Sequence, residues 1–331
     1  MRLRRRLTAK GPQIEAARDG GWLSLDRVPR LRGLIGDHGA DTDGACSMIP
    51  LLQLGPRGWQ ALTAELQQIP LEPLPEGPLI LPLGPLSFRD FMLYEQHAIN
   101  AARGFARRFM PSAYKVARIV EAITRRPFRK FRPHRLWYAQ PVYYFGNHLN
   151  FLTDGQEIPW PSYTDALDYE LELGAVLARP LCDATPQEAE AAIGGFVVLN
   201  DLSARDVQLD EMRSGFGPQK SKHFASIMSA ELVTADEILP RQNELSGSVS
   251  INGRQVAQCS TRNARYSLAE AIAFAAKDER LHPGELFGSG TLPGGCGMEN
   301  GHWLRSGDQL TLVIEGVGSL SAIIGSKRGK L

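Results

Sequence analysis

The pattern of apolar and polar residues predicts many short strands. Residues 168–177 alternate with a period of two, which indicates a strand with an acidic and an apolar face. The apolar run Ile193–Leu199 predicts a buried strand. The segments 310–314 and 320–324 predict a hairpin, because glycines lie between two runs of apolar residues.

Signals for helices are fewer. Residues near 58–68 predict a helix, and residues 88–109 predict another because their apolar side chains recur at a spacing near 3.6. Two capping boxes, Thr185–Glu188 and Ser267–Glu270, predict helix N-termini. The helix that begins after Ser267 is expected to run to about Lys277.

These elements predict a β-rich α+β fold, since strands and helices do not alternate as in a doubly wound sheet. We expect a small β-rich N-terminal domain over residues 1–75 and a larger domain over residues 76–331. The proline-rich stretch Pro70–Pro85 suits an extended connection between them. No GxGxxG or P-loop sequence is present, so a nucleotide cofactor has no support.

Composition excludes several classes of protein. The 331 residues carry a net charge of +1, so no global field favours nucleic acid or an anionic membrane. No apolar stretch approaches the ~20 residues of a membrane helix, and the basic residues 2–6 are not followed by the apolar core of a secretory signal. The cysteines at 46, 182, 259 and 296 form no CxxC pair, which argues against a zinc knuckle or a disulfide framework and favours a cytoplasmic setting.

The segment 110–135 is rich in lysine and arginine. We interpret it as a solvated helix and loop. A basic patch that draws an anionic substrate to an active site is the alternative. Binding of nucleic acid is the least favoured interpretation, since no aromatic stacking platform accompanies the charges.

Three carboxylates indicate chemistry. Glu170 and Glu172 lie two apart on the strand predicted at 168–177, and Asp201 follows the next apolar run. Anions this close repel one another unless a cation lies between them, and oxygen ligands favour Mg²⁺, Mn²⁺ or Ca²⁺ over zinc. The alternative is a strand with a solvent-facing acidic edge. The apolar neighbours and the polar segment Asn200–Gln208 favour the metal site.

Further motifs occur in a fixed order between Ser87 and Ile324. They are Asp90-Phe91, Gln96-His97, Pro141–Tyr144, Asp168–Leu173, Asn200–Gln208, Lys222 and Gly288–Thr291. In order and spacing they resemble the fumarylacetoacetate hydrolase family. The resemblance implies a mixed β-roll or barrel-like catalytic domain, and the segment before it resembles the small N-terminal barrel of the longer members.

The resemblance also implies a metal centre. Glu170, Glu172 and Asp201 would hold the divalent metal, with Asp90 as a fourth carboxylate ligand. Mg²⁺ is the expected ion, with Ca²⁺ or Mn²⁺ as alternatives.

The family resemblance assigns the water-activating base to His97, with Glu299 orienting its imidazole. Arg205, Gln208 and Lys222 would stabilise charge that develops on the substrate. Lys222 is preferred to the nearby Lys220, because the sequence after Lys222 follows the family pattern better.

The substrate pocket departs from the family. Tyr144, Gln208 and Thr291 match substrate-contacting residues. Met92, however, stands where the family enzyme has a substrate-binding tyrosine, and Met212 stands near the position of another tyrosine of that pocket. Ala106 stands in place of an arginine, for which Arg103 or Arg107 could substitute. These changes favour a related, more apolar dicarbonyl compound over fumarylacetoacetate.

The function implied by the resemblance is metal-dependent hydrolysis of a C–C bond in a 1,3-dicarbonyl acid, such as an acylpyruvate, in the catabolism of aromatic or related compounds. A decarboxylase, or an isomerase or hydratase of keto acids, on the same metal site is the first alternative. A non-catalytic metal-binding homologue is the second. The resemblance also implies a homodimer.

Overall fold

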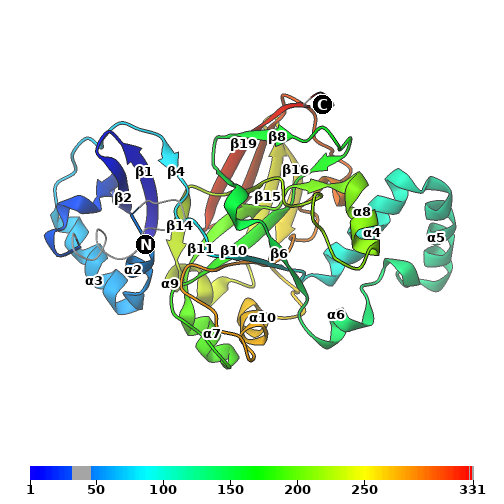
Figure 1. The fold of residues 1–331 in the computed structure, drawn as a ribbon, viewed down its shortest axis with the longest axis horizontal. Helices are drawn as coiled ribbons and strands as arrows, with labels where there is room; N and C mark the ends of the chain where they lie inside the picture. The colour runs from blue at the N-terminus through cyan, green and yellow to red at the C-terminus, as the bar shows by residue number, and fades with distance from the viewer. Residues whose placement is uncertain (32–45, 328, 330–331) are drawn as a thin grey trace.

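The computed structural model describes residues 1–31, 46–327 and 329 and is built around a twelve-stranded mixed sheet (Figure 1). Across this sheet the order is β3 (Gly21–Ser24), β2 (Gly11–Arg18), β1 (Arg2–Thr8), β14 (Glu231–Thr234), β11 (Ile193–Asn200), β10 (Leu171–Leu177), β17 (Leu286–Gly288), β5 (Phe88–Phe91) and β6 (Tyr143–Gly146). Three further strands join it, with β13 (Ser226–Met228) between β11 and β7 (Phe151–Thr153), and β4 (Leu79–Ile80) against β1.

A five-stranded sheet packs against the large sheet. Its strands, in order, are β16 (Arg254–Ser260), β15 (Ser246–Ile251), β18 (Gln309–Ile314), β19 (Gly318–Lys327) and β8 (Glu157–Trp160). A two-stranded ribbon pairs β12 (Ser203–Ala204) with β9 (Leu167–Asp168). This content confirms the predicted β-rich α+β fold.

The helices lie around these sheets (Figure 1). They are α2 (Ile49–Leu52), α3 (Gly55–Gln68), α4 (Glu95–Phe109), α5 (Pro111–Thr124), α6 (Arg135–Ala139), α7 (Pro186–Ala192), α8 (Arg205–Arg213), α9 (Ala235–Ile238), α10 (Leu268–Ala275) and α11 (Gly297–Asn300). Short 3₁₀ turns occur at Leu25–Arg27, Pro29–Leu31, Arg129–Phe131, His148–Asn150 and Leu239–Arg241. No helix in the described ranges is both long and apolar enough to span a membrane.

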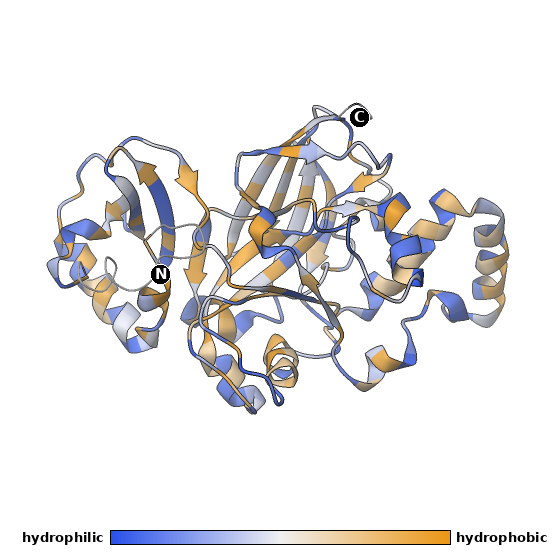
Figure 2. Cartoon of the chain, viewed as in Figure 1, coloured by the Kyte–Doolittle hydropathy of each residue, from blue (hydrophilic) through white to orange (hydrophobic). Residues whose placement is uncertain are grey.

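The central strands are buried on both faces. On β10, Leu173 belongs to the apolar core that the large sheet shares with the five-stranded sheet, whereas Val176 belongs to a second core that includes residues of α2 and α3. On β11, Phe196 belongs to the first of these cores and Val197 to the second. This double burial explains the continuous apolar run at 193–199, and Figure 2 shows apolar residues throughout these strands.

Most of the predicted elements are confirmed. The strand at 193–199, the terminal hairpin, the helix near 58–68 and both capping boxes are present. The strand predicted at 168–177 is present over Leu171–Leu177. The prediction of one helix over 88–109 was wrong, because its first four residues form β5 and pair with β17 and β6. All four are buried, so pairing in the sheet outweighs the helical spacing that continues into α4.

The N-terminal strands continue the large sheet, since β1 pairs with β14 through Leu3 and Leu232. The division into domains at residue 75 stays a prediction. In the segment 110–135 each lysine and arginine is exposed, as expected of a solvated helix and loop.

Candidate functional site

Three buried carboxylates converge at one end of the central strands. Asp90 lies in β5, Glu172 lies in β10, and Asp201 directly follows β11. One carboxylate oxygen of each lies within 4.8 Å of the others. Apolar neighbours show which face of the sheet Asp90 and Asp201 lie on. Phe88 lies two positions before Asp90, Leu199 lies two positions before Asp201, and both apolar side chains belong to the second core. Side chains two apart on a strand share a face, so the carboxylates project to the same side.

Two oxygens of the cluster lack the partners that buried anions require. Asp90 Oδ1 and Glu172 Oε2 are buried and accept no hydrogen bond from any described residue. Burial, reinforced by repulsion from neighbouring carboxylates, raises the pKa of both Asp90 and Glu172 well above the usual range. Three carboxylates, two of which have an unpaired oxygen, fit a hard divalent cation such as Mg²⁺, Mn²⁺ or Ca²⁺.

Metal binding is expected to depend on pH through these two carboxyl groups. Their raised pKa values mean that, without metal, the folded protein holds protons that the unfolded chain releases, so the stability of the metal-free protein falls as the pH rises above about 4. A cation replaces those protons. We therefore expect the Mg²⁺-induced rise in Tm to be larger at about pH 8 than at about pH 5, as measured by calorimetry. An equal shift at both values would contradict this account.

A glycine makes room for the cluster. Gly288 of β17 pairs with Gly174 of β10 on one side and Asp90 of β5 on the other. A Cβ atom at Gly288 would lie 2.9 Å from Glu172 Oε2 and still closer to Asp90 Oδ1. A side chain there would push the two carboxylates apart.

Gly288→Ala is therefore expected to weaken Mg²⁺ binding by roughly tenfold to a hundredfold, since displaced ligands lose affinity. Calorimetric titration measures the affinity, and circular dichroism checks that the fold is kept. Unchanged affinity in a folded variant would show that the cluster does not hold the metal.

Glu170 lies beside this cluster and is held by two cations. Arg205 donates to Oε1 at 2.6 Å and Lys222 donates to Oε2 at 2.5 Å. Burial alone would raise the pKa of Glu170, but these two charges hold it well below its usual range. The role of Glu170 as a metal ligand thus stays a prediction, because both of its oxygens are engaged.

Lys222 connects Glu170 to the carboxylate cluster, since its ammonium group also bonds Asp201 Oδ2. The carboxylates raise the pKa of Lys222 even though burial acts to lower it, so the side chain is charged. Lys220, the other candidate, is exposed and lies over the ring of Tyr163. The geometry therefore favours Lys222 as the lysine at this site.

Arg205 begins α8 and joins three segments. Its Nε donates to Asp168 at 2.8 Å, and its Nη1 donates to Gln208 Oε1 at 3.0 Å. Asp168 also accepts hydrogen bonds from the backbone N–H groups of Gly297 and Met298 in α11. Sequence reasoning assigned no role to Asp168, although this aspartate directly precedes the acidic strand.

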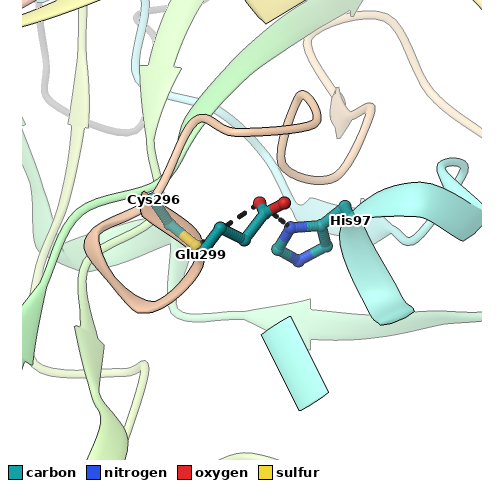
Figure 3. Close-up of side chains that lie close together, drawn as sticks. All are labelled: His97, Cys296 and Glu299. Carbon is teal, nitrogen blue, oxygen red and sulfur yellow. Dashed lines mark hydrogen bonds and ion pairs between the residues drawn. The ribbon is translucent and has the colours of Figure 1, made fainter. Parts of the chain in front are cut away.

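A histidine and a glutamate form a second group (Figure 3). His97 of α4 contacts Glu299 Oε1 of α11 through Nδ1 at 2.6 Å. Glu299 Oε2 accepts from the backbone N–H of Gly294 at 3.0 Å, so the carboxylate is fixed from both sides. The helices approach closely at Gly104, where a Cβ atom would collide with the carbonyl group of Met298. The predicted pairing of His97 with Glu299 is thus present in the structure.

Two predicted substrate residues touch the carboxylates. Tyr144 donates to Asp201 Oδ2 at 2.7 Å, and Thr291 lies 3.4 Å from Glu172 Oε1. Their contact with substrate stays a prediction.

The other predicted pocket residues are Met92, Met212 and the arginines near Ala106. Met92 follows β5 and is partly buried, with its carbonyl oxygen accepting from Trp137 Nε1. Met212 lies on α8 with half of its surface exposed. Of the two arginines considered as substitutes near Ala106, Arg103 pairs with Glu121, whereas Arg107 donates to the carbonyl oxygen of Glu299 at 3.4 Å. Because it contacts Glu299, Arg107 is the better candidate of the two to replace the arginine of the family.

Comparison with curated proteins finds partial matches. A Burkholderia multivorans protein, assigned provisionally as a hydrolase, is 32% identical over 169 residues, which is 50% of this chain and 58% of that protein. The human mitochondrial oxaloacetate tautomerase FAHD1 is 27% identical over 184 residues, which is 55% of this chain and 80% of that protein. The chain thus spans little more than half the length of the first relative.

Solved structures match along almost the whole chain. The fumarylacetoacetate hydrolase of Exiguobacterium antarcticum superposes with a TM-score of 0.68 at 19% identity, covering 98% of this chain and 99% of that one. This similarity shows a common fold and confirms the predicted fold type. The family model described as the fumarylacetoacetate (FAA) hydrolase C-terminal domain matches residues 115–324. The chain therefore belongs to the fumarylacetoacetate hydrolase family.

Proposed function

We propose that this chain is a divalent-metal-dependent hydrolase that cleaves a C–C bond in a 1,3-dicarbonyl acid. The observation that carries the proposal is the presence of two groups in one site. A buried carboxylate cluster with unpaired oxygens lies close to a histidine whose imidazole is held by a carboxylate. Glu170 links the two, since Lys222 bonds both Glu170 and Asp201, and the charges of Arg205, Lys222 and His97 lower the pKa of Glu170 against the effect of burial.

Asp90, Glu172 and Asp201 would hold the metal, and Mg²⁺ is the ion we propose. When bound there, a divalent cation polarises a carbonyl group and offsets negative charge on an enol oxygen.

His97 is suited to remove a proton from water. Because Nδ1 is directed at Glu299, that nitrogen carries the proton and Nε2 is left as the proton acceptor. Glu299 fixes this tautomer and stabilises the imidazolium that forms. The side chain of His97 is 10% exposed and that of Glu299 is 2% exposed, so little solvent weakens their interaction.

Charge that develops on the substrate oxygen would be stabilised by Lys222 and Arg205. Both are buried, and their orientation is fixed before reaction by Glu170, Asp168 and Asp201. Fixed cations away from water stabilise a forming oxyanion without having to reorganise. Gln208, held by Arg205, lies at the outer side of this pair.

A tautomerase of keto acids is the second candidate. It is supported by the match to human FAHD1, whose name gives oxaloacetate tautomerase as its activity. Both reactions need a base and a group that stabilises an enolate, but hydrolysis also needs an activated water. The His97–Glu299 pair provides for that step, which is why we favour the hydrolase.

An absorbance assay tests the proposal. Fumarylacetoacetate, fumarylpyruvate, acetylpyruvate and oxaloacetate are each incubated with the protein and Mg²⁺, or with EDTA. We expect loss of the enol band of at least one diketo acid, dependent on Mg²⁺ and abolished by EDTA. Methionines at positions 92 and 212 favour the less polar substrates of this panel. Turnover of oxaloacetate alone would contradict the hydrolase assignment.

A further inference from the structure

The His97–Glu299 pair has a third neighbour. Cys296 lies at the start of α11 and its Sγ contacts Glu299 Oε1 at 3.5 Å. One donor atom each from His97, Cys296 and Glu299 lies within 4.8 Å of the other two. Figure 3 shows the three side chains directed toward one another.

These donors differ in kind from those of the carboxylate cluster. An imidazole nitrogen, a sulfur and one carboxylate oxygen favour zinc and other borderline ions over Mg²⁺. Three protein ligands are enough for zinc where water takes the fourth position, as in catalytic zinc sites. The carboxylate cluster offers only oxygen, which Mg²⁺ prefers. Among the described residues, these two groups of donors thus favour different metal ions.

Backbone contacts and burial position the three side chains. Cys296 is fully buried, and Glu170, beside the carboxylate cluster, forms a backbone bridge with it. Cys296 and Glu299 lie within one helical turn, and α4 brings His97 against them. The side chain of His97 is the most exposed of the three, so it marks the path by which an ion would enter.

We propose that His97, Cys296 and Glu299 form a second metal site, which binds Zn²⁺ separately from the carboxylate cluster. On binding, the thiol of Cys296 loses its proton to solvent, and the proton on His97 Nδ1 is exchanged through solvent for one on Nε2, so that the imidazole stays neutral. Nδ1 and the carboxylate of Glu299 then bond to the ion in place of each other. Because zinc would occupy the proposed water-activating pair, it would inhibit hydrolysis. The inhibition rests on the proposed function, whereas the binding does not.

Cobalt serves as the probe, since Co²⁺ replaces zinc and gives a charge-transfer band when bound to thiolate. The protein is first saturated with Mg²⁺, so that the carboxylate cluster is occupied, and is then titrated with Co²⁺. We expect one equivalent to bind with the charge-transfer band. If excess Mg²⁺ abolishes the band, the two ions share one site and the proposal fails. This test needs no variant.

Cys296→Ser is expected to remove the band and to weaken zinc binding by at least roughly tenfold. Cys182→Ser, at an exposed position, is the control and should bind like the wild type. Cys259→Ser tests a second buried thiol, whose pKa is raised to about 12 by burial and by Glu299. A band that survives Cys296→Ser, or that disappears with Cys259→Ser instead, would overturn the assignment.

Activity gives an independent readout. Zinc added to the Mg²⁺-saturated enzyme should inhibit turnover, and the inhibition should be at least roughly tenfold weaker in Cys296→Ser. If no substrate is turned over, the proposed function fails while the cobalt titration still decides the metal site. If turnover is found but zinc has no effect while Co²⁺ binds through Cys296, the inhibitory part of the proposal is wrong.

Discussion

Glu172→Gln is expected to abolish Mg²⁺ binding and to lower turnover by roughly 10³-fold or more, since a metal that polarises a carbonyl supplies several kcal/mol of transition-state stabilisation. Glu172 is fully buried, and its Oε2 has no partner among the described residues. The amide keeps the shape of the side chain but removes its charge. Calorimetric titration with Mg²⁺ and the enol assay measure the two effects.

Stability should change in the opposite direction. Without metal, burial and repulsion from Asp90 and Asp201 disfavour the charged form of Glu172. The amide is neutral without taking up a proton, so the metal-free variant should melt at or above the Tm of the metal-free wild type at neutral pH. Mg²⁺ should then raise the Tm of the wild type only. Glu315→Gln, at an exposed site, is the control and should leave both properties unchanged. A variant that is destabilised without metal and still binds Mg²⁺ would contradict the assignment of Glu172.

His97→Gln is expected to lower turnover by roughly 10² to 10⁴-fold, the usual contribution of general base catalysis. Mg²⁺ affinity should stay within about twofold of the wild type, because His97 is outside the carboxylate cluster. Steady-state assays and metal titration on the same samples separate the two effects. His282→Gln, at an exposed histidine, is the control and should retain full activity. Full activity of His97→Gln would show that another group activates the water.

The strands that carry the site could be predicted from the sequence because their patterns are local. Period-two alternation located Glu172, and the end of an apolar run located Asp201. Asp90 was different, since its segment resembles a helix and forms a strand only through pairing with β17 and β6. Its place near a metal followed from the family resemblance alone, not from its local pattern.

Contacts between distant segments could not be predicted. The spacing of Glu170 and Glu172 predicted that both lie on one face of a strand. In the structure, β10 begins only at Leu171, and Glu170 forms ion pairs with Arg205 and Lys222. In the sequence, Gly288 was noted only as part of a motif. It leaves room for the carboxylates of Asp90 and Glu172 because β17 pairs with β5 and β10, and that pairing is not visible in the local sequence. No zinc knuckle or disulfide that would include Cys296 was predicted, and nothing in its local sequence indicates that α4 brings a histidine close to it.

Whether the carbon skeleton of the substrate is cleaved tests the proposed C–C hydrolysis most directly. The diketo acid that loses its enol band is incubated with the wild-type protein and Mg²⁺ in ¹⁸O-labelled water, and the products are identified by mass spectrometry. The account predicts two shorter products, with ¹⁸O in the newly formed carboxylate, and almost none of them from His97→Gln. An intact carbon skeleton, or loss of carbon dioxide alone, would contradict the hydrolase and favour a tautomerase or a decarboxylase on the same metal site.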